Sequence, residues 1–476
     1  MEQAILIVDF GTSNVRAVCF SSETGMVLAS QSRKYTLISP VPSYQELDPR
    51  EVWELSVDCV RTVMEKIGKS AVVRALNFSF IGASLFPLDD MFEPTYNCIL
   101  CFDPRAVDIA SEMAPKFRTT TTHFNDHWAP PAKILWLKEH EPAVFAKTKY
   151  YWSIQQYILY RLGLTPMWDP TMANLQDMFD LADNDWREDI LTYAGITRDQ
   201  IDAPLIASDQ TVGMTDHYGD VELGTKIPVG VGAHDGDLGM LGLGLLGEDG
   251  DVIAEVSGTF DHLGFIADKD ERTHKIKWKP GLLKDTMVIM LGFPTYGADI
   301  EWFIRTFYNG NSEEAYADLW ANCSFDGMPS LLVNPAFSGC GTFFNMDLTT
   351  TKYDIFKGLV EALTFETRRS AEAALRHKKN GAVRIRIGGG PSSSDEWAQL
   401  RANITGMTIE RVVSSDNSAL GAAVLASLFA GLYPSVADAS AHLVRVRDSF
   451  VPDPKLFALY NERYREYCEK IPRSEE

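Results

Sequence analysis

The residues with the clearest chemical potential form a turn near the start of the chain. Residues 5–20 read as an apolar strand, a polar turn and a second strand, with Asp9 at the end of the first strand. Glycine lets such a turn approach a phosphate group closely, and a carboxylate beside it can hold hydrated Mg²⁺. The turn residues that could donate hydrogen bonds to phosphate are Gly11, Thr12, Ser13 and Asn14. A single turn of this kind is more often an ordinary hairpin, in which Asp9 bonds its own turn.

The same layout recurs about half a chain away. Residues 252–265 again read as strand, turn and strand, with Gly258 and Thr259 in the turn. The repeat predicts two similar lobes, each presenting a Gly-Thr turn to a bound phosphate chain. A third glycine-rich turn, residues 388–390, follows an apolar strand and precedes a helix expected over 395–402. Taken alone, this third turn is equally typical of a simple strand-to-helix connection.

These three segments, in this order, resemble the FGGY carbohydrate kinases, which belong to the actin-like, ribonuclease-H-like ATPase superfamily. The likeness covers nearly the whole chain. It includes residues 231–237, where the family places its catalytic aspartate, and Asp416 shortly before Gly421. The resemblance implies an α/β fold of two ribonuclease-H-like lobes with a cleft between them. The expected lobes are residues 1–247 and 248–476, because a glycine-rich run and an acidic turn separate them.

The resemblance also implies ATP and Mg²⁺ as cofactors and phosphoryl transfer to a sugar hydroxyl. Asp235 occupies the catalytic position of the family and is expected to act as general base and, with Asp9, as a metal ligand. The alternative is that Asp235 caps the helix that follows, although Asp237 could fill that role. The residues expected to bind ATP or its phosphates are Gly11, Thr12, Ser13, Asn14, Gly258, Thr259, Gly389, Gly390 and Ser394. Arg16 is expected to point either into the cleft or toward solvent.

The sugar side of the site has a less specific sequence pattern. The expected substrate-binding residues are Ser79, Asp103, Arg105, Asp169, His234 and Asp235. The His-Asp pair at 234 and 235 and the segment 169–174 look most similar to the L-fuculokinase and L-rhamnulokinase branch. Asp103 and Arg105 also have a structural interpretation as an ion pair, and His234 has one as a core histidine.

One departure from the family lies at Ile81, where relatives carry a polar residue for the sugar hydroxyls. A sugar hydroxyl buried against Ile81 without a partner would cost about 1–3 kcal/mol. We expect a ketose substrate, such as a 6-deoxyketohexose or a ketopentulose, or else a polyol or another hydroxylated metabolite. Two other classes stay open: a catalytically silent sugar sensor, and an actin-like or chaperone ATPase that hydrolyses ATP without sugar.

Composition narrows the set of partners. The chain has 476 residues, of which 45% are hydrophobic, enough for two domains. A formal net charge of −21 argues against nucleic acid and anionic membranes, because both require a basic face. Seven scattered cysteines form no disulfide framework, and no apolar run reaches the ~18 residues of a membrane helix. We expect a cytoplasmic protein whose partner is a small-molecule sugar, with a homodimer left open.

Several helices must hold the site residues in place. Apolar residues at steps of three and four predict helices over 49–66, 132–140, 153–162, 298–308, 353–377, 420–430 and 454–470. The last of these carries an aromatic stripe that we interpret as a packing face, made by Phe457, Tyr460, Tyr464 and Tyr467. Trp397 is likewise interpreted as a core residue.

Overall fold

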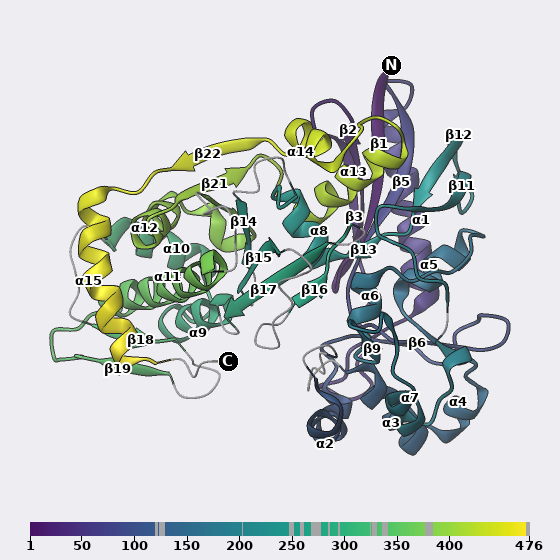
Figure 1. The fold of residues 1–476 in the computed structure, drawn as a ribbon, viewed down its shortest axis with the longest axis horizontal. Helices are drawn as coiled ribbons and strands as arrows, with labels where there is room; N and C mark the ends of the chain where they lie inside the picture. The colour runs from purple at the N-terminus through teal and green to yellow at the C-terminus, as the bar shows by residue number, and fades with distance from the viewer. Residues whose placement is uncertain are drawn as a thin grey trace. The chain divides into compact units, whose positions relative to one another are not determined.

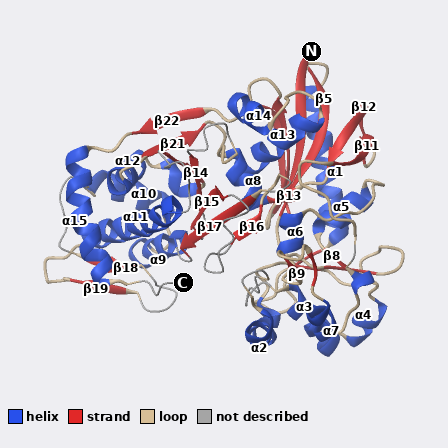
Figure 2. Cartoon of the chain, viewed as in Figure 1, coloured by secondary structure: helices blue, strands red, loops and turns tan. Residues whose placement is uncertain are grey.

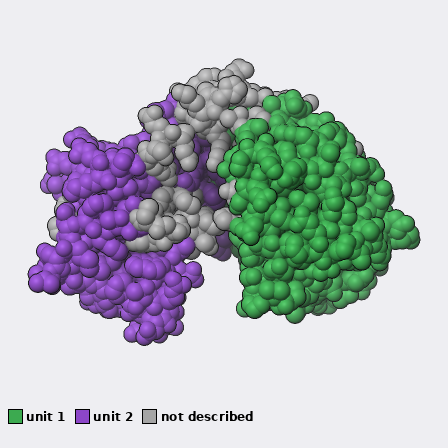
Figure 3. All heavy atoms as spheres, turned by 90° about the horizontal axis from the view of Figure 1, so that it is seen from below, with its two compact units in different colours: residues 1–242, 268–288, 416–444 green, residues 243–267, 289–415, 445–476 purple. Residues whose placement is uncertain are grey.

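The protein divides into two compact units, which Figure 3 colours separately. The computed structural model describes residues 1–119, 122, 129–201, 203–246, 252–257, 261–267, 278–283, 286–293, 296–323, 325, 331–335, 341–376 and 384–472. Unit 1 comprises Met1–Gly242, Asp268–Val288 and Asp416–Val444, and unit 2 comprises Leu243–Ala267, Ile289–Ser415 and Arg445–Glu476. Each unit is therefore made of three separate stretches of the chain, whereas each expected lobe is one continuous stretch. The lobe boundary at 247/248 stays a prediction.

A mixed β-sheet forms the centre of unit 1 (Figure 1). Its strands lie in the order β11-β12-β5-β1-β2-β3, and β13 also pairs with β5. The strands are β1 (Glu2–Phe10), β2 (Asn14–Ser21), β3 (Val27–Lys34), β5 (Ala71–Phe80), β11 (Thr211–Tyr218), β12 (Val221–Gly230) and β13 (Ala233–His234). β1 runs antiparallel to β2 and parallel to β5, and β13 is also parallel to β5. The carboxyl ends of β1, β5 and β13 therefore meet at one edge of the sheet.

Two helices from distant parts of the sequence pack closely in unit 1. They are α8 (Asp235–Gly242) and α13 (Asn417–Phe429), and α13 also packs on β1 and β5. A Cβ atom on Gly421 would lie 1.9 Å from the carbonyl oxygen of Leu238, and one on Gly242 would lie 1.9 Å from that of Asn417. Glycine is required at both contacts because the two backbones touch. The close approach fixes the helix that begins at Asp235.

The remaining elements of unit 1 surround this sheet and extend from it. The helices are α1 (Pro49–Ile67), α2 (Val107–Phe117), α3 (Pro130–His140), α4 (Pro142–Lys147), α5 (Ile154–Arg161), α6 (Pro170–Asn174), α7 (Glu188–Ala194) and α14 (Val436–Leu443). The short strands are β4 (Glu46–Leu47), β6 (Phe86–Leu88), β7 (Cys98–Ile99), β8 (Tyr150–Trp152), β9 (Phe179–Asp180), β10 (Asp185–Trp186) and β16 (Trp278–Pro280). Six of these short strands form the pairs β4-β7, β6-β8 and β9-β10.

Unit 2 contains a second sheet, whose strands lie in the order β17-β15-β14-β20-β21-β22. These strands are β14 (Val252–Ser257), β15 (Asp261–Ala267), β17 (Met287–Phe293), β20 (Arg384–Gly388), β21 (Thr408–Val412) and β22 (Val446–Phe450), and a separate pair is β18 (Leu332–Asn334) with β19 (Thr342–Phe344). Figure 2 shows in blue the helices of this unit, which are α9 (Tyr296–Tyr308), α10 (Ser312–Asn322), α11 (Lys352–Arg376), α12 (Asp395–Thr405) and α15 (Pro454–Lys470). As in unit 1, an antiparallel hairpin, β14-β15, adjoins a parallel strand, β20.

The helices predicted from the spacing of apolar residues are confirmed by the structure. Each expected helix is present, with its ends displaced by a few residues at most. The aromatic side chains Tyr460, Tyr464 and Tyr467 of α15 are buried in the apolar core of unit 2, as is Trp397. Within the part of the chain that the structure describes, no helix combines the length and apolarity needed to cross a membrane.

We expect Gly421→Ala to destabilise the protein strongly, because the new methyl group would meet the Leu238 carbonyl of α8. The free energy of unfolding should fall by about 3 kcal/mol or more, at the upper end of overpacking effects. Urea denaturation measures the change. Ser418→Ala, a partly exposed position of the same helix, should change stability by less than about 0.5 kcal/mol. Equal stabilities for the two variants would contradict the close helix contact.

Candidate active site

Four of the expected site residues meet at the carboxyl ends of three parallel strands in unit 1. Asp9 near the end of β1 is aligned with Ser79 near the end of β5, and Ser79 is aligned with Ala233 of β13. His234 ends β13, and Asp235 begins α8 directly afterwards. The carboxyl ends of parallel strands are where ligands usually bind in sheets of this kind. The arrangement therefore brings Asp9, Ser79, His234 and Asp235 together.

The expected phosphate turn lies between β1 and β2, next to Asp9. The Gly11 N–H donates to the Asn14 carbonyl at 3.0 Å, which closes the turn. Thr12 is half-buried and Ser13 is exposed. The turn is thus tight and accessible from solvent, as an anion-binding turn must be.

Arg16 of β2 lies between two carboxylates. Its Nη1 donates to Asp416 Oδ1, and its Nη2 is 3.6 Å from Asp9 Oδ2. Asp416 directly precedes α13, in the N-cap position. The structure places the Arg16 side chain, for which the sequence left two orientations open, next to Asp9.

The environment of Asp9 disfavours its negative charge. The pKa of the Asp9 carboxyl is raised to about 6, mainly by burial and also by the neighbouring charges of Asp235 and Asp416. Ser79 and Arg16 oppose the shift, by a hydrogen bond and by positive charge respectively. Asp9 is therefore a carboxylate with an excess of negative charge around it, which a cation would relieve.

His234 connects Asp235 to a buried carboxylate. Its Nε2 is 3.0 Å from Asp235 Oδ1, and its Nδ1 is 2.7 Å from Asp237 Oδ2. Lys279 Nζ lies 3.8 Å from the same Asp237 oxygen. Burial lowers the pKa of His234, but Asp235 and Asp237 together outweigh it and raise this pKa to about 9. The imidazole therefore stays protonated at neutral pH, and the Asp235 side chain beside it remains 39% exposed.

Asp169 is a buried residue that supports the position of His234. It is fully buried and caps α6, accepting hydrogen bonds from the N–H groups of Thr171 and Met172. The Thr171 hydroxyl donates to Asp169 at 2.7 Å and accepts from the His234 N–H at 3.0 Å. Burial raises the pKa of Asp169, opposed by these hydrogen bonds and by one from Ser208. Asp169 thus positions His234 through Thr171, and direct contact of Asp169 with sugar stays a prediction.

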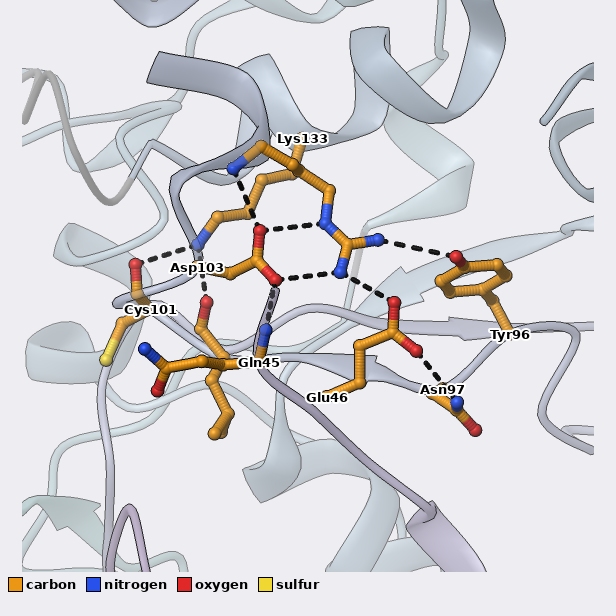
Figure 4. Close-up of polar contacts among 9 residues, drawn as sticks. Gln45, Glu46, Tyr96, Asn97, Cys101, Asp103 and Lys133 are labelled. Atoms are coloured by element: carbon orange, nitrogen blue, oxygen red, sulfur yellow. Dashed lines mark hydrogen bonds and ion pairs between the residues drawn. The ribbon is translucent and has the colours of Figure 1, made fainter. Parts of the chain in front are cut away.

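Asp103 and Arg105 form part of a buried cluster of charges (Figure 4). Asp103 accepts from the Gln45 N–H at 2.6 Å and from Arg105 Nη2 at 2.7 Å. Arg105 Nη2 also donates to Glu46 at 2.6 Å. The Arg105 guanidinium lies 4.2 Å from the centre of the Tyr44 ring. Both charged side chains of the Asp103–Arg105 pair are completely buried. These contacts favour the ion-pair interpretation, and their contact with sugar stays a prediction.

Lys133 completes this cluster and was not anticipated from the sequence. Its Nζ donates to the carbonyl oxygens of Leu100 at 2.7 Å and Cys101 at 3.0 Å. Burial lowers the pKa of Lys133 to about 8. Nothing in the local sequence marks Lys133 or Glu46 as buried, because their partners come from other segments.

The expected nucleotide residues of unit 2 lie at the ends of its strands. Gly389 follows β20 with φ of 95°, and a Cβ there would lie 1.9 Å from the Ser257 carbonyl, so only glycine fits. Gly390 begins a short 3₁₀ turn, and Ser394 caps α12 by accepting from the Trp397 N–H at 3.1 Å. The expected phosphate-binding residues Gly258 and Thr259 fall outside the described residues.

Comparison with known proteins accounts for this geometry. Residues 4–242 match the FGGY family of carbohydrate kinases, N-terminal domain, and residues 309–430 match the FGGY family of carbohydrate kinases, C-terminal domain. The chain belongs to the FGGY family of carbohydrate kinases. It is an enzyme that transfers a phosphoryl group to an alcohol group, and ATP is the donor implied by the kinase family. The resemblance drawn from the sequence motifs is confirmed.

Individual FGGY kinases are similar to this chain over almost their whole length. The xylulose kinase of Bacillus subtilis (strain 168) is 24% identical over 486 residues, which cover 97% of this chain and 96% of the relative. The autoinducer-2 kinase of Salmonella choleraesuis (strain SC-B67) is 24% identical, covering 96% and 92%. The crystal structure of xylulose kinase from Lactobacillus acidophilus has a TM-score of 0.85 at 23% identity, covering 98% of this chain and 97% of that one. The expected two-lobed actin-like fold is confirmed.

The carboxylates of unit 1 suit a magnesium ion that arrives with a nucleotide. Mg²⁺ usually keeps several waters and takes one or two protein carboxylates together with substrate phosphates. Among the described residues no group of three or more histidine, cysteine or acidic side chains is arranged to hold a metal by itself. Asp9, with its excess of negative charge beside an accessible turn, offers the single carboxylate that such a hydrated ion requires.

We expect Asp9→Asn to make the folded protein more stable at neutral pH. The folded-state pKa of Asp9 lies above its unfolded value, so the stability that Asp9 contributes is lost as pH rises from about 4 to about 6. Above pH 6 the ionised carboxylate is a penalty, and the variant should exceed the wild type by about 1–3 kcal/mol. Urea denaturation at pH 4, 5, 6 and 7 measures this, and a difference that does not shrink toward pH 4 would contradict the shift.

Asp103→Asn should lower the free energy of unfolding by about 3–5 kcal/mol, because it leaves the buried Arg105 under-compensated. Urea denaturation gives the change. The control is Asp189→Asn, which breaks an exposed ion pair with Arg187 and should cost less than about 1 kcal/mol. A variant of Asp103 that keeps its stability and loses sugar affinity would instead place this residue in the sugar pocket.

Proposed function

We propose that this kinase uses Mg-ATP to phosphorylate a hydroxyl group of a ketose, with Asp235 as general base. The supporting observation is the position of Asp235 at the carboxyl ends of β1, β5 and β13, half-exposed and bonded to His234. Asp235 is in the same unit as the phosphate turn and Asp9. A carboxylate near the attacking hydroxyl and a separate carboxylate near the phosphates are the two acidic groups that such a transfer needs.

In this proposal each residue contributes positioning or charge. Asp235 accepts the proton of the sugar hydroxyl as the oxygen attacks the γ-phosphorus, and the bond to ADP breaks on the opposite side. His234 holds the Asp235 carboxylate in one orientation, and Asp237 and Thr171 in turn hold His234. When bound, Mg²⁺ would neutralise phosphate charge beside Asp9, the residue proposed to hold it, with Asp235 as the second expected ligand.

The nucleotide is proposed to contact short turns of the chain. The residues assigned to ATP are Gly11, Thr12, Ser13, Asn14, Gly258, Thr259, Gly389, Gly390 and Ser394. Glycines at such turns expose backbone N–H groups to phosphate oxygens. At Gly389 the Ser257 carbonyl already requires glycine, so the proposed contact of Gly389 with the nucleotide rests on the resemblance to the family.

The substrate is proposed to be a 6-deoxyketohexose or a ketopentulose. The relatives described above are named for xylulose and for autoinducer-2, and the His234-Asp235 pair resembles that of the deoxysugar kinases. Ile81 favours a second candidate, a polyol or other hydroxylated metabolite. Its side chain is buried at the end of β5 and offers no hydrogen bond where the family carries a polar residue. A homodimer and a cytoplasmic location remain parts of the proposal.

Asp235→Asn should lower kcat by about 10²–10⁴, because the amide cannot accept the proton, and should leave the affinity for ATP without Mg²⁺ unchanged. A coupled assay of ADP release with ketopentoses, 6-deoxyketohexoses, other ketohexoses and polyols identifies the substrate and measures the loss. Asp216→Asn is a matched control, since Asp216 pairs with the adjacent His217 at 2.8 Å on an exposed strand. Full turnover by the Asp235 variant would remove this residue from the base role.

A further inference from the structure

Asp416 occupies a helix N-cap position without capping the helix. Aspartate at this position usually accepts a hydrogen bond from an N–H of the first helical turn. At the start of α13 no such side-chain bond exists, although the Asp416 carbonyl still accepts from Leu420 N–H at 2.9 Å. The Asp416 carboxylate instead accepts from Arg16, 400 positions earlier in the chain. The Asp416 side chain therefore bonds to a residue of the β1–β2 hairpin in place of the first turn of its own helix.

The guanidinium of Arg16 lies closer to the carboxylate of Asp416 than to that of Asp9. It directly contacts Asp416, while its Nη2 stays 3.6 Å from Asp9, beyond a normal hydrogen bond. Arg16 and Asp9 face each other across the β1–β2 hairpin. Side chains at facing positions of such a hairpin are close enough to pair directly. If the Asp416 carboxylate were absent, we expect the guanidinium of Arg16 to pair with the Asp9 carboxylate.

We propose that Asp416 is a positioning residue, which holds the guanidinium of Arg16 away from Asp9 and thereby leaves the Asp9 carboxylate available to the metal of Mg-nucleotide. This inference rests on the proposed function. An arginine that closes a bidentate pair with a carboxylate occupies both of its oxygens. Such a pair on Asp9 would compete directly with Mg²⁺ and its ordered water. Asp416 prevents it by offering Arg16 a second carboxylate.

The position of Asp416 is well suited to this role because α13 is rigidly held. Gly421 of α13 touches the backbone of α8 at Leu238, and Asn417 touches Gly242. Asn77 of β5 also donates to the Ala422 carbonyl of α13 at 3.0 Å. A carboxylate at the start of so firmly packed a helix keeps its place when the charges around Arg16 change.

The test separates metal-dependent from metal-independent nucleotide binding. Calorimetry measures ADP binding to the full chain, once with excess Mg²⁺ and once with EDTA. Asp416→Asn should raise the Kd for ADP about tenfold in Mg²⁺ and leave it unchanged in EDTA, whereas Asp416→Glu should stay close to wild type. Asp220→Asn, which breaks an exposed ion pair with Arg61 in the same unit, should change neither value.

A second variant removes the charge and offers the helix a side-chain cap. Asp416→Ser supplies a preferred N-cap side chain that is smaller than asparagine, so it is an independent test of the lost charge, and it should show the same Mg²⁺-specific loss. In an Arg16→Met background the effect of either substitution should disappear, because there is no guanidinium left to redirect.

Several outcomes would overturn the inference. Equal weakening in Mg²⁺ and EDTA would show that Asp416 acts on the nucleotide or on α13 itself. Persistence of the loss in the Arg16→Met background would show the same. Unchanged Mg-ADP affinity in the asparagine and serine variants of Asp416 would show that Asp416 has no role. A wild-type protein that fails to bind Mg-ADP would contradict the proposed function instead, so the two failures are distinguishable.

Discussion

Keeping carboxylates close to one another and largely away from water is the constraint on which the arrangement of unit 1 depends. Burial, together with the charges of Asp235 and Asp416, makes it harder for Asp9 to carry its charge. The fold nevertheless holds these side chains together by well-packed backbone elements, above all the contact of α8 with α13 at two glycines. Arg16 and His234 offset part of the repulsion without occupying the carboxylates fully. The protein therefore keeps negative charge in place for a cation that arrives with its substrate, at a cost in stability that is common at functional sites.

The acidic residues of this unit fall into two physical kinds. Asp103 and Asp169 are completely buried, and several protein donors saturate their oxygens. Residues of this kind fix the shape of the surrounding segments, because an unsatisfied buried charge would be strongly unfavourable. Asp235 is different, since much of its side chain faces solvent while one oxygen is bonded to His234. Accessibility, more than the presence of a carboxylate, separates a group that can react from a group that supports it.

Much of this organisation could be predicted from the sequence, because it depends on local patterns. Strand periodicity and the Gly-Thr turn identified β1 and β2, and helical spacing identified α1 and α15. The contacts that could not be predicted join distant segments. In the sequence Asp416 is marked only by its place shortly before Gly421, and only the fold shows its carboxylate on Arg16. The cluster of Glu46, Arg105 and Lys133 is similar, since three separate segments supply its charges and no local pattern marks them as partners.

The return of the chain to unit 1 has a consequence for folding during synthesis. The helix that packs against β1, β5 and α8 belongs to Asp416–Val444, and most of unit 2 is encoded between this segment and residue 242. At translation rates of about 5–20 residues per second, β5, which ends at Phe80, waits about 20–70 s for this helix, which ends at Phe429. During that interval the apolar surface that α13 will cover lacks its native partner. This apolar surface should therefore stay exposed on the nascent chain until residues 416–444 have emerged from the ribosome.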